Sequence, residues 1–145
     1  TGHTLLLLDA TGSYHRETIR HDAGAHATVS TPLTLLQDPT HTRIVIVTLA
    51  ETTPVNEAAQ LQDELRRAHI EPFAWVVNRS LAAAHPTDAI LRARANAERL
   101  EIARITEHHA RRLFAVPYLA VAPTGAAGLR ALLTAPQPNP SPSAA

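Results

Sequence analysis

Thr42-Arg-Ile-Val-Ile-Val-Thr48 is a continuous, largely β-branched run of residues that predicts a buried strand. A helical pattern follows between Pro54 and His69, where apolar residues recur at Val55, Ala58, Leu61, Leu65 and Ala68. Thr53 is the expected N-cap and Pro54 the expected first helical residue. The run Phe73-Ala-Trp-Val-Val77 predicts a second strand. A strand, a helix and a strand in this order predict a βαβ unit with parallel strands.

The same alternation continues on both sides of this unit. Thr4-Leu-Leu-Leu-Leu-Asp9 and Leu113-Phe-Ala-Val-Pro117 are two further short apolar runs. The segment from Asp88 to His109 contains neither Gly nor Pro and predicts one long helix or two in series. Its expected apolar side is formed by Ile90, Leu91, Ala95, Leu100, Ala103 and Ile105. The predicted fold class is α/β, a mostly parallel sheet flanked by helices. The continuous apolar runs predict strands buried on both faces, and right-handed crossovers predict helices over both.

A single domain is expected over residues 1–134. Short helices are predicted at Pro32 to Gln37 and after Thr124-Gly125. Residues 135–145 carry four prolines among Ser, Ala and Asn, a composition that predicts a disordered tail. Residue 1 is Thr, and the first residues already resemble a loop that leads into a buried strand, so we expect a piece of a longer protein.

The composition limits what this chain does by itself. It has 13 basic and 13 acidic side chains, a balance that does not favour a nucleic-acid-binding surface. All the basic residues are Arg and no GxxxxGK[ST] pattern occurs, so the segment holds no phosphate-binding P-loop. The absence of Cys excludes a disulfide or a thiolate metal site from this chain alone. Apolar runs such as Leu5–Leu8 and Ile44–Val47 are far too short to span a bilayer.

In an open parallel sheet, ligands bind beyond the carboxyl ends of the strands. Four segments are expected there: Asp9–Gly12, Leu49–Pro54, Asn78–Leu81 and Pro117–Thr124. Asn78 directly follows a predicted strand, and its amide offers a donor and an acceptor that match the N6 and N7 edge of adenine. The alternative is that Asn78 only turns the chain after a strand.

Other polar residues also have two interpretations. Glu51 to Thr53 either contact a nucleotide or another subunit, or only start the following helix. His3 either ligates a metal or makes a local hydrogen bond. His108 and His109 point in different directions on the predicted helix and are interpreted as surface residues. The nine histidines form no HxH or HExxH zinc pattern.

Four blocks of the sequence and a closing segment resemble, in order, segments of one known family. They are Thr1-Gly-His-Thr-Leu-Leu-Leu-Leu-Asp-Ala-Thr-Gly-Ser-Tyr-His-Arg-Glu17, Thr31-Pro-Leu-Thr-Leu-Leu-Gln-Asp-Pro39, Val47-Thr-Leu-Ala-Glu-Thr-Thr-Pro-Val-Asn-Glu-Ala-Ala-Gln-Leu-Gln62, Phe73-Ala-Trp-Val-Val-Asn-Arg-Ser-Leu81, and Val116-Pro117 followed by Pro123-Thr-Gly125. The first resembles the segment that completes the DTAP-TGHT signature of arsenical pump-driving ATPases (the ArsA family). The likeness extends from residue 1 to about residue 133.

The resemblance implies the C-terminal part of a P-loop NTPase domain of the deviant Walker A class. The P-loop and the Asp-Thr-Ala-Pro half of the signature would lie upstream, so ATP and Mg²⁺ would be held mainly by residues outside this segment, which contains no catalytic residue. Thr1, Gly2, His3 and Thr4 would form the signal-transduction segment that couples loss of the γ-phosphate to a metalloid site. Asn78 would contact adenine, and Pro117 in the loop Pro117–Ala122 would line the base or the ribose.

His3 would further be a metalloid ligand. As(III) and Sb(III) favour thiolates, so cysteines from elsewhere must complete the site. The chain departs from the family in having no Cys, and it resembles the second half of such an ATPase, where the Cys precedes the signature. The implied function is an ATP-hydrolysing subunit that energises arsenite or antimonite efflux, with the metalloid as allosteric ligand. The implied partners are a membrane permease and a second ATPase half or a homodimer partner, at the cytoplasmic face of the plasma membrane.

Two alternatives accompany this interpretation. An ATPase that targets tail-anchored membrane proteins needs a Met-rich or strongly apolar client groove, and this chain contains no Met. A non-enzymatic remnant that binds a partner agrees with the absence of catalytic residues. In each case the segment alone is expected to have negligible ATPase activity.

Overall fold

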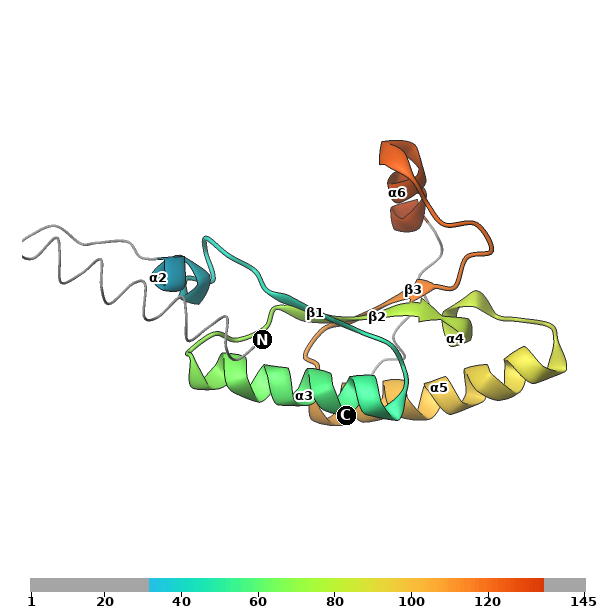
Figure 1. Cartoon of the computed structure of the whole chain (residues 1–145), viewed down its shortest axis with the longest axis horizontal. Helices are drawn as coiled ribbons and strands as arrows, with labels where there is room; N and C mark the ends of the chain where they lie inside the picture. Colours follow the sequence, from blue (N-terminus) through green and yellow to red (C-terminus); the bar gives the residue numbers. More distant parts are fainter. Residues whose placement is uncertain (1–31, 135–145) are drawn as a thin grey trace, which may run out of the picture. The chain divides into compact units, whose positions relative to one another are not determined.

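The computed structural model describes residues 32–134 (Figure 1). The predicted strand from Thr4 to Asp9 and the predicted tail of residues 135–145 lie outside the described residues. The described elements are α2 (Pro32–Gln37), β1 (Val45–Thr48), α3 (Thr52–Arg67), β2 (Ala74–Ser80), α4 (Leu81–Ala84), α5 (Ala89–His108), β3 (Leu113–Pro117) and α6 (Gly125–Thr134). They divide between two compact units, one with the described residues up to Val45 and Ala59–Phe73, the other with Ile46–Ala58 and the residues from Ala74 onward.

The three strands form a parallel sheet in the order β1-β2-β3. β2 and β3 pair with Trp75 beside Leu113 and Val77 beside Ala115. The connections between strands are helical, since α3 follows β1 and the pair α4 and α5 follows β2. The predicted α/β class, a parallel sheet flanked by helices, is therefore confirmed.

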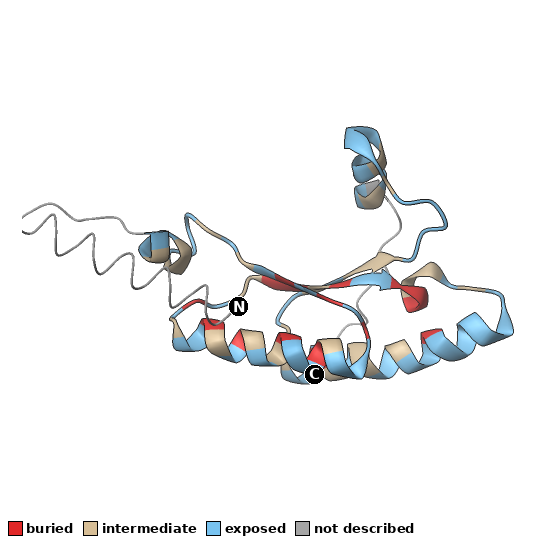
Figure 2. Ribbon diagram, viewed as in Figure 1, coloured by how far each residue is buried: buried red, intermediate tan, exposed pale blue. Residues whose placement is uncertain are grey.

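The strands contain exposed as well as buried residues, contrary to the prediction of strands buried on both faces (Figure 2). Trp75 and Val77 are 1% and 0% exposed, whereas Val47 and Phe114 on the other face are 61% and 47% exposed. The order β1-β2-β3 advances in one direction, so right-handed crossovers place the first turns of α3 and the whole of α5 on the same face (Figure 1). The prediction of helices over both faces is wrong for the described residues.

α3 begins two residues earlier than the sequence indicates. The carbonyl of Glu51 accepts the N–H of Val55 at 3.0 Å, so Glu51 and not Thr53 occupies the N-cap position. Pro54 lies in the first turn, where its missing N–H breaks no intrahelical hydrogen bond. Of the predicted apolar side, Leu61 is only half-buried. The buried residues are instead spaced three and four apart, at Val55, Ala58, Gln62 and Leu65.

α5 is a single helix of 20 residues, and Asp88 caps its first turn. The Asp88 carboxylate accepts the N–H groups of Ile90 and Leu91 at 2.9 and 3.0 Å. The predicted apolar side is only partly correct, because Ile90 and Leu100 are 74% and 75% exposed. The side that faces the protein is narrower and consists of Ala95, Glu98, Ile102 and Ile105, spaced three and four residues apart.

α4 is a four-residue helix that the sequence pattern does not reveal, since one turn has no periodicity. Ser80 is its N-cap, with Oγ accepting the N–H of Ala83 at 3.1 Å. Leu81 and Ala82 are buried against Ala95 of α5. The helix stops at His85, which has the left-handed conformation with φ of 50°.

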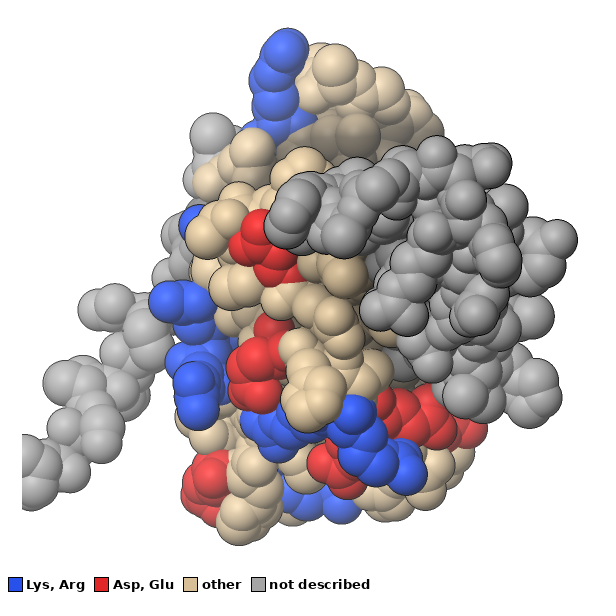
Figure 3. All heavy atoms as spheres, turned by 90° about the vertical axis from the view of Figure 1, so that its left-hand side faces the viewer, with Lys and Arg blue, Asp and Glu red and all other residues tan. Residues whose placement is uncertain are grey.

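The first unit carries its own polar contacts. The side-chain amide of Gln37 in α2 donates to the carbonyl of Ala68 at 2.8 Å, just after the end of α3. Arg66 makes two 3.0 Å hydrogen bonds to Glu71, which raise the pKa of the guanidinium. The hydroxyl and the N–H of Thr40 donate to Asp38 and lower the pKa of that carboxyl. Figure 3 shows basic and acidic side chains interspersed on one face.

Candidate functional site

The carboxyl ends of β2 and β3 lie side by side. β2 extends to Ser80, so the prediction that Asn78 follows the strand is wrong. Asn78 lies inside β2, between the paired residues Val77 and Ser80. Asn78 and the next residue, Arg79, are both exposed. Pro117 ends β3, as predicted, and is the register partner of Ser80. The structure therefore brings the two predicted nucleotide-binding residues, Asn78 and Pro117, to neighbouring strand ends.

The pairing of β2 with β3 contains a bulge at this edge. Val77 pairs with Ala115 and Ser80 pairs with Pro117, so three steps along β2 match two along β3. Arg79 accommodates the extra residue by adopting a positive φ of 55°. Regular alternation from the buried Val77 would bury Arg79 and expose Ser80. The bulge reverses this, because Ser80 is 1% exposed while Arg79 reaches solvent next to the exposed Asn78.

A flat cationic group and an aromatic ring lie next to Asn78. The guanidinium carbon of Arg79 is 5.4 Å from the centre of the Tyr118 ring, within the range of a cation–π contact. The N–H of Tyr118 donates to the carbonyl of Ser80 at 2.9 Å, which continues the ladder one residue past β3. Tyr118 is 45% exposed. The family resemblance implied that the loop Pro117–Ala122, which contains Tyr118, lines the base or the ribose, but the sequence singled out neither Tyr118 nor Arg79.

Glu98 of α5 reaches this strand end from the buried face. Its Oε2 accepts the hydroxyl of Ser80 and the N–H of Ala82, each at 3.0 Å. Among the described residues no ion pair involves Glu98. The sequence analysis missed Glu98 because a carboxylate on the inward side of a helix does not fit an apolar pattern. One sequence feature does place Glu98 on the inward side of α5: it lies three residues after Ala95 and four residues before Ile102.

After the end of β1, the structure supports the second interpretation of Glu51 to Thr53, namely that they start the following helix. These residues begin α3, as the bond from Val55 to Glu51 shows. The hydroxyl of Thr52 donates to Glu101 of α5 at 2.8 Å and so joins the start of one helix to the middle of another. Glu101 also pairs with Arg104 at 2.8 Å.

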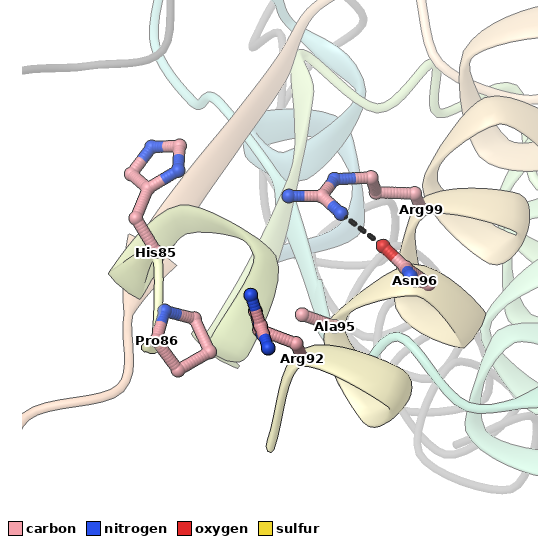
Figure 4. Close-up of a pocket in the computed structure, with 6 residues that line it drawn as sticks. All are labelled: His85, Pro86, Arg92, Ala95, Asn96 and Arg99. Atoms are coloured by element: carbon pink, nitrogen blue, oxygen red, sulfur yellow. Dashed lines mark hydrogen bonds between the residues drawn. The ribbon is translucent and has the colours of Figure 1, made fainter. Parts of the chain in front are cut away.

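A polar pocket of about 340 Å³ lies between the end of α4 and the first half of α5 (Figure 4). Its lining consists of His85, Pro86, Arg92, Ala95, Asn96 and Arg99. Figure 4 shows Arg92 and Arg99 on the same side of α5, with the guanidinium of Arg99 hydrogen-bonded to the side-chain oxygen of Asn96. No carboxylate lines this pocket, and the sequence analysis did not select its residues.

The two adjacent histidines behave differently. His108 is exposed, as predicted. His109 is not a plain surface residue, because its ring stacks on Trp75 with the ring centres 5.6 Å apart and the planes 20° from parallel. The described part of the chain holds no cluster of three or more His, Cys, Asp or Glu suited to a metal ion. The predicted signal-transduction residues Thr1, Gly2, His3 and Thr4, including the metalloid ligand His3, lie outside the described residues.

The chain is similar to known proteins over almost its whole length. Residues 1–135 match the family of anion-transporting ATPases designated ArsA ATPase. An arsenical pump-driving ATPase of Escherichia coli is 51% identical over 132 residues, which are 91% of this chain and 22% of that protein. The arsenical pump-driving ATPase of Acidiphilium multivorum is 48% identical over 134 residues, which are 92% of this chain and 23% of that protein.

The chain thus spans less than a quarter of the length of these curated relatives. The family match nevertheless covers far more than half of the chain, and the sheet has the parallel α/β arrangement that the family resemblance implied. Within residues 32–134 no helix is both long and apolar enough to cross a membrane. With the fold and the sequence similarity in agreement, this chain belongs to the ArsA family of anion-transporting ATPases.

Proposed function

We propose that this chain is the base-binding portion of an ATP-hydrolysing subunit that energises arsenite or antimonite efflux. One observation carries the proposal: Asn78 is exposed at the carboxyl edge of a parallel sheet, in the bulge of β2 and beside Pro117 of β3. Ligands of open parallel α/β sheets bind at this edge. Family membership supplies the use of ATP.

The groups at the edge suit a purine base. The Asn78 amide offers a donor and an acceptor side by side, as the N6 and N7 edge of adenine requires. The Tyr118 ring and the Arg79 guanidinium are flat groups that are able to cover the face of a base. The base therefore fits the residues present.

The described residues do not fit the phosphates or Mg²⁺. The chain has no Lys, and its described residues hold no carboxylate cluster for a metal ion. Residues of the longer protein must supply those contacts, together with the cysteines that would join His3 at a metalloid site. We assign Thr1 to Thr4 to the coupling of the two sites. The partners that this proposal includes are a membrane permease and a second ATPase half or copy, at the cytoplasmic face of the membrane.

A chimera tests this function directly. The segment of the Escherichia coli arsenical pump-driving ATPase that aligns with this chain is replaced by the chain itself, which 51% identity makes feasible. We expect the chimera to hydrolyse ATP and the purified 145-residue chain alone to show negligible hydrolysis. In the chimera, Asn78→Ala is expected to reduce the preference for ATP over GTP by about tenfold, near the low end of what one bidentate base contact supplies.

A matched control is Asn96→Ala, which changes the same residue type on the exposed side of α5 and is expected to leave the nucleotide preference unchanged. The proposal is wrong if a soluble chimera hydrolyses no ATP. The base-binding role is wrong if Asn78→Ala and Asn96→Ala give the same ratio of KM values for GTP and ATP.

A further inference from the structure

The bulge at the end of β2 is a disfavoured local structure that needs support from outside the strand. Arg79 carries a Cβ and still has a positive φ of 55°, a conformation that non-glycine residues adopt reluctantly. The bulge also removes one step of regular pairing between Val77 and Ser80. Without a compensating contact, regular register would turn Ser80 outward and Arg79 inward, and would change the backbone geometry on both sides of Asn78.

Glu98 supplies that contact from a different element. Its Oε2 accepts both the Ser80 hydroxyl and the Ala82 N–H at 3.0 Å, while the Ser80 Oγ accepts the Ala83 N–H at 3.1 Å. Ser80 is 1% exposed, so its hydroxyl has no water to replace Glu98. These three bonds hold Ser80 inward and start α4 directly after the bulge.

The neighbouring residues make this contact rigid. Ala95, three residues before Glu98, is 1% exposed and packs on Leu81 and Ala82 of α4. Ile102, four residues after Glu98, packs against the same cluster. The position of the Glu98 carboxylate is therefore set by the packing of α5 on α4, and a carboxylate so placed fixes where β2 ends.

We propose that Glu98 is a positioning residue for nucleotide recognition: by holding Ser80 inward, it fixes the end of β2 that carries Asn78, and so sets how the Asn78 amide meets the adenine base. This inference rests on the proposed function of the β2 edge. As a positioning residue, Glu98 contacts neither the base nor a phosphate. Its effect is on the geometry of Asn78, and therefore on base preference and KM rather than on the rate of the chemical step.

The test uses the chimera with the Escherichia coli relative and compares KM and kcat for ATP and GTP. Glu98→Ala is expected to raise the KM for ATP and to lower the preference for ATP over GTP by about tenfold, with kcat changed by less than about threefold. Glu98→Gln keeps an oxygen acceptor for Ser80 and Ala82, so we expect values within about twofold of the parent. Glu107→Ala removes an exposed carboxylate from the same helix and serves as the matched control.

The outcomes separate this inference from the proposed function. If Asn78→Ala lowers the preference for ATP while Glu98→Ala leaves it at the parent value, the positioning role is refuted and the base-binding role stands. If neither variant changes the preference, the base-binding role itself fails. Should Glu98→Ala prove insoluble, Ser80→Ala removes the hydroxyl end of the same contact and must show the same loss of preference, and an unchanged preference there would refute the inference.

Discussion

Replacement of Ser80 by Ala measures how strongly the contact at the end of β2 stabilises the fold. The change removes the N-cap of α4, which costs about 1 kcal/mol for a Ser hydroxyl. It also removes the 3.0 Å bond to the Glu98 carboxylate. We take about 1.5 kcal/mol for that bond, the low end for bonds to charged groups, because Glu98 is only half-buried and keeps its bond to Ala82. The expected loss in the free energy of unfolding is therefore about 2.5 kcal/mol.

Urea denaturation of the 145-residue chain, followed by tryptophan fluorescence, provides the assay. Trp75 is the only Trp and is 1% exposed against His109, so its emission reports on the unit that contains β2 and α5. With a slope of about 2 kcal/mol per molar urea, the midpoint is expected to fall by about 1.2 M. Thr106→Ala removes an exposed hydroxyl that only bonds back to its own helix and is expected to change stability by less than about 0.5 kcal/mol.

A double-mutant cycle makes the reasoning refutable. Ser80→Ala and Glu98→Ala delete the two ends of one hydrogen bond, so we expect a coupling energy of at least about 0.5 kcal/mol. If the two losses add without coupling, or if Ser80→Ala costs no more than Thr106→Ala at an unchanged slope, the bond between Ser80 and Glu98 does not stabilise the strand end.

Three further predictions use the same chain. Ile105→Ala, at a site 0% exposed, is expected to cost about 2–5 kcal/mol in urea denaturation, whereas Leu100→Ala on the same helix, 75% exposed, should cost less than about 0.5 kcal/mol. His85→Gly is expected to stabilise the chain by about 0.5–1 kcal/mol, because glycine adopts the observed φ of 50° without strain, and equal stability of the two proteins would contradict this. Thr40→Val removes the hydroxyl bond to Asp38, so an NMR titration should show the pKa of Asp38 rising toward its ordinary value. A lowered carboxyl pKa contributes stability above the unfolded pKa and loses it as the pH falls through the folded pKa, so this acid-side loss should shrink in the variant, and an unchanged pKa would refute the assignment.

The parallel strands were predictable because their signal is local. β3 occupies the predicted residues 113–117, and β1 and β2 overlap their predicted runs, since β-branched and aromatic residues favour a pleated, buried backbone wherever they lie. The single long helix after Asp88 follows from the same kind of evidence, an uninterrupted stretch of good helix formers behind a capping carboxylate.

The errors occur where a contact distant in the sequence overrides the local pattern. The apolar side of α5 was misplaced because Ile90 and Leu100 are exposed while the polar Glu98 faces inward. Glu98 faces inward because polar groups of β2 and α4 need a hydrogen-bond partner there, and the periodicity of α5 does not contain this information. His109 was read as a surface residue for the same reason, since its partner Trp75 is 34 positions away.

The amino-acid sequence by itself determined the α/β class, the family and the choice of Asn78 and Pro117 as candidate base-binding residues, because these depend on residue types in a fixed order. Only the tertiary structure decided how that edge is built. The bulge, the exposure of Arg79 and the inward turn of Ser80 arise from the registry of β2 on β3 and from the carboxylate of Glu98 on a separate helix. Registry and hydrogen bonds between elements are set when the elements pack together, and a pattern read along one segment does not contain them.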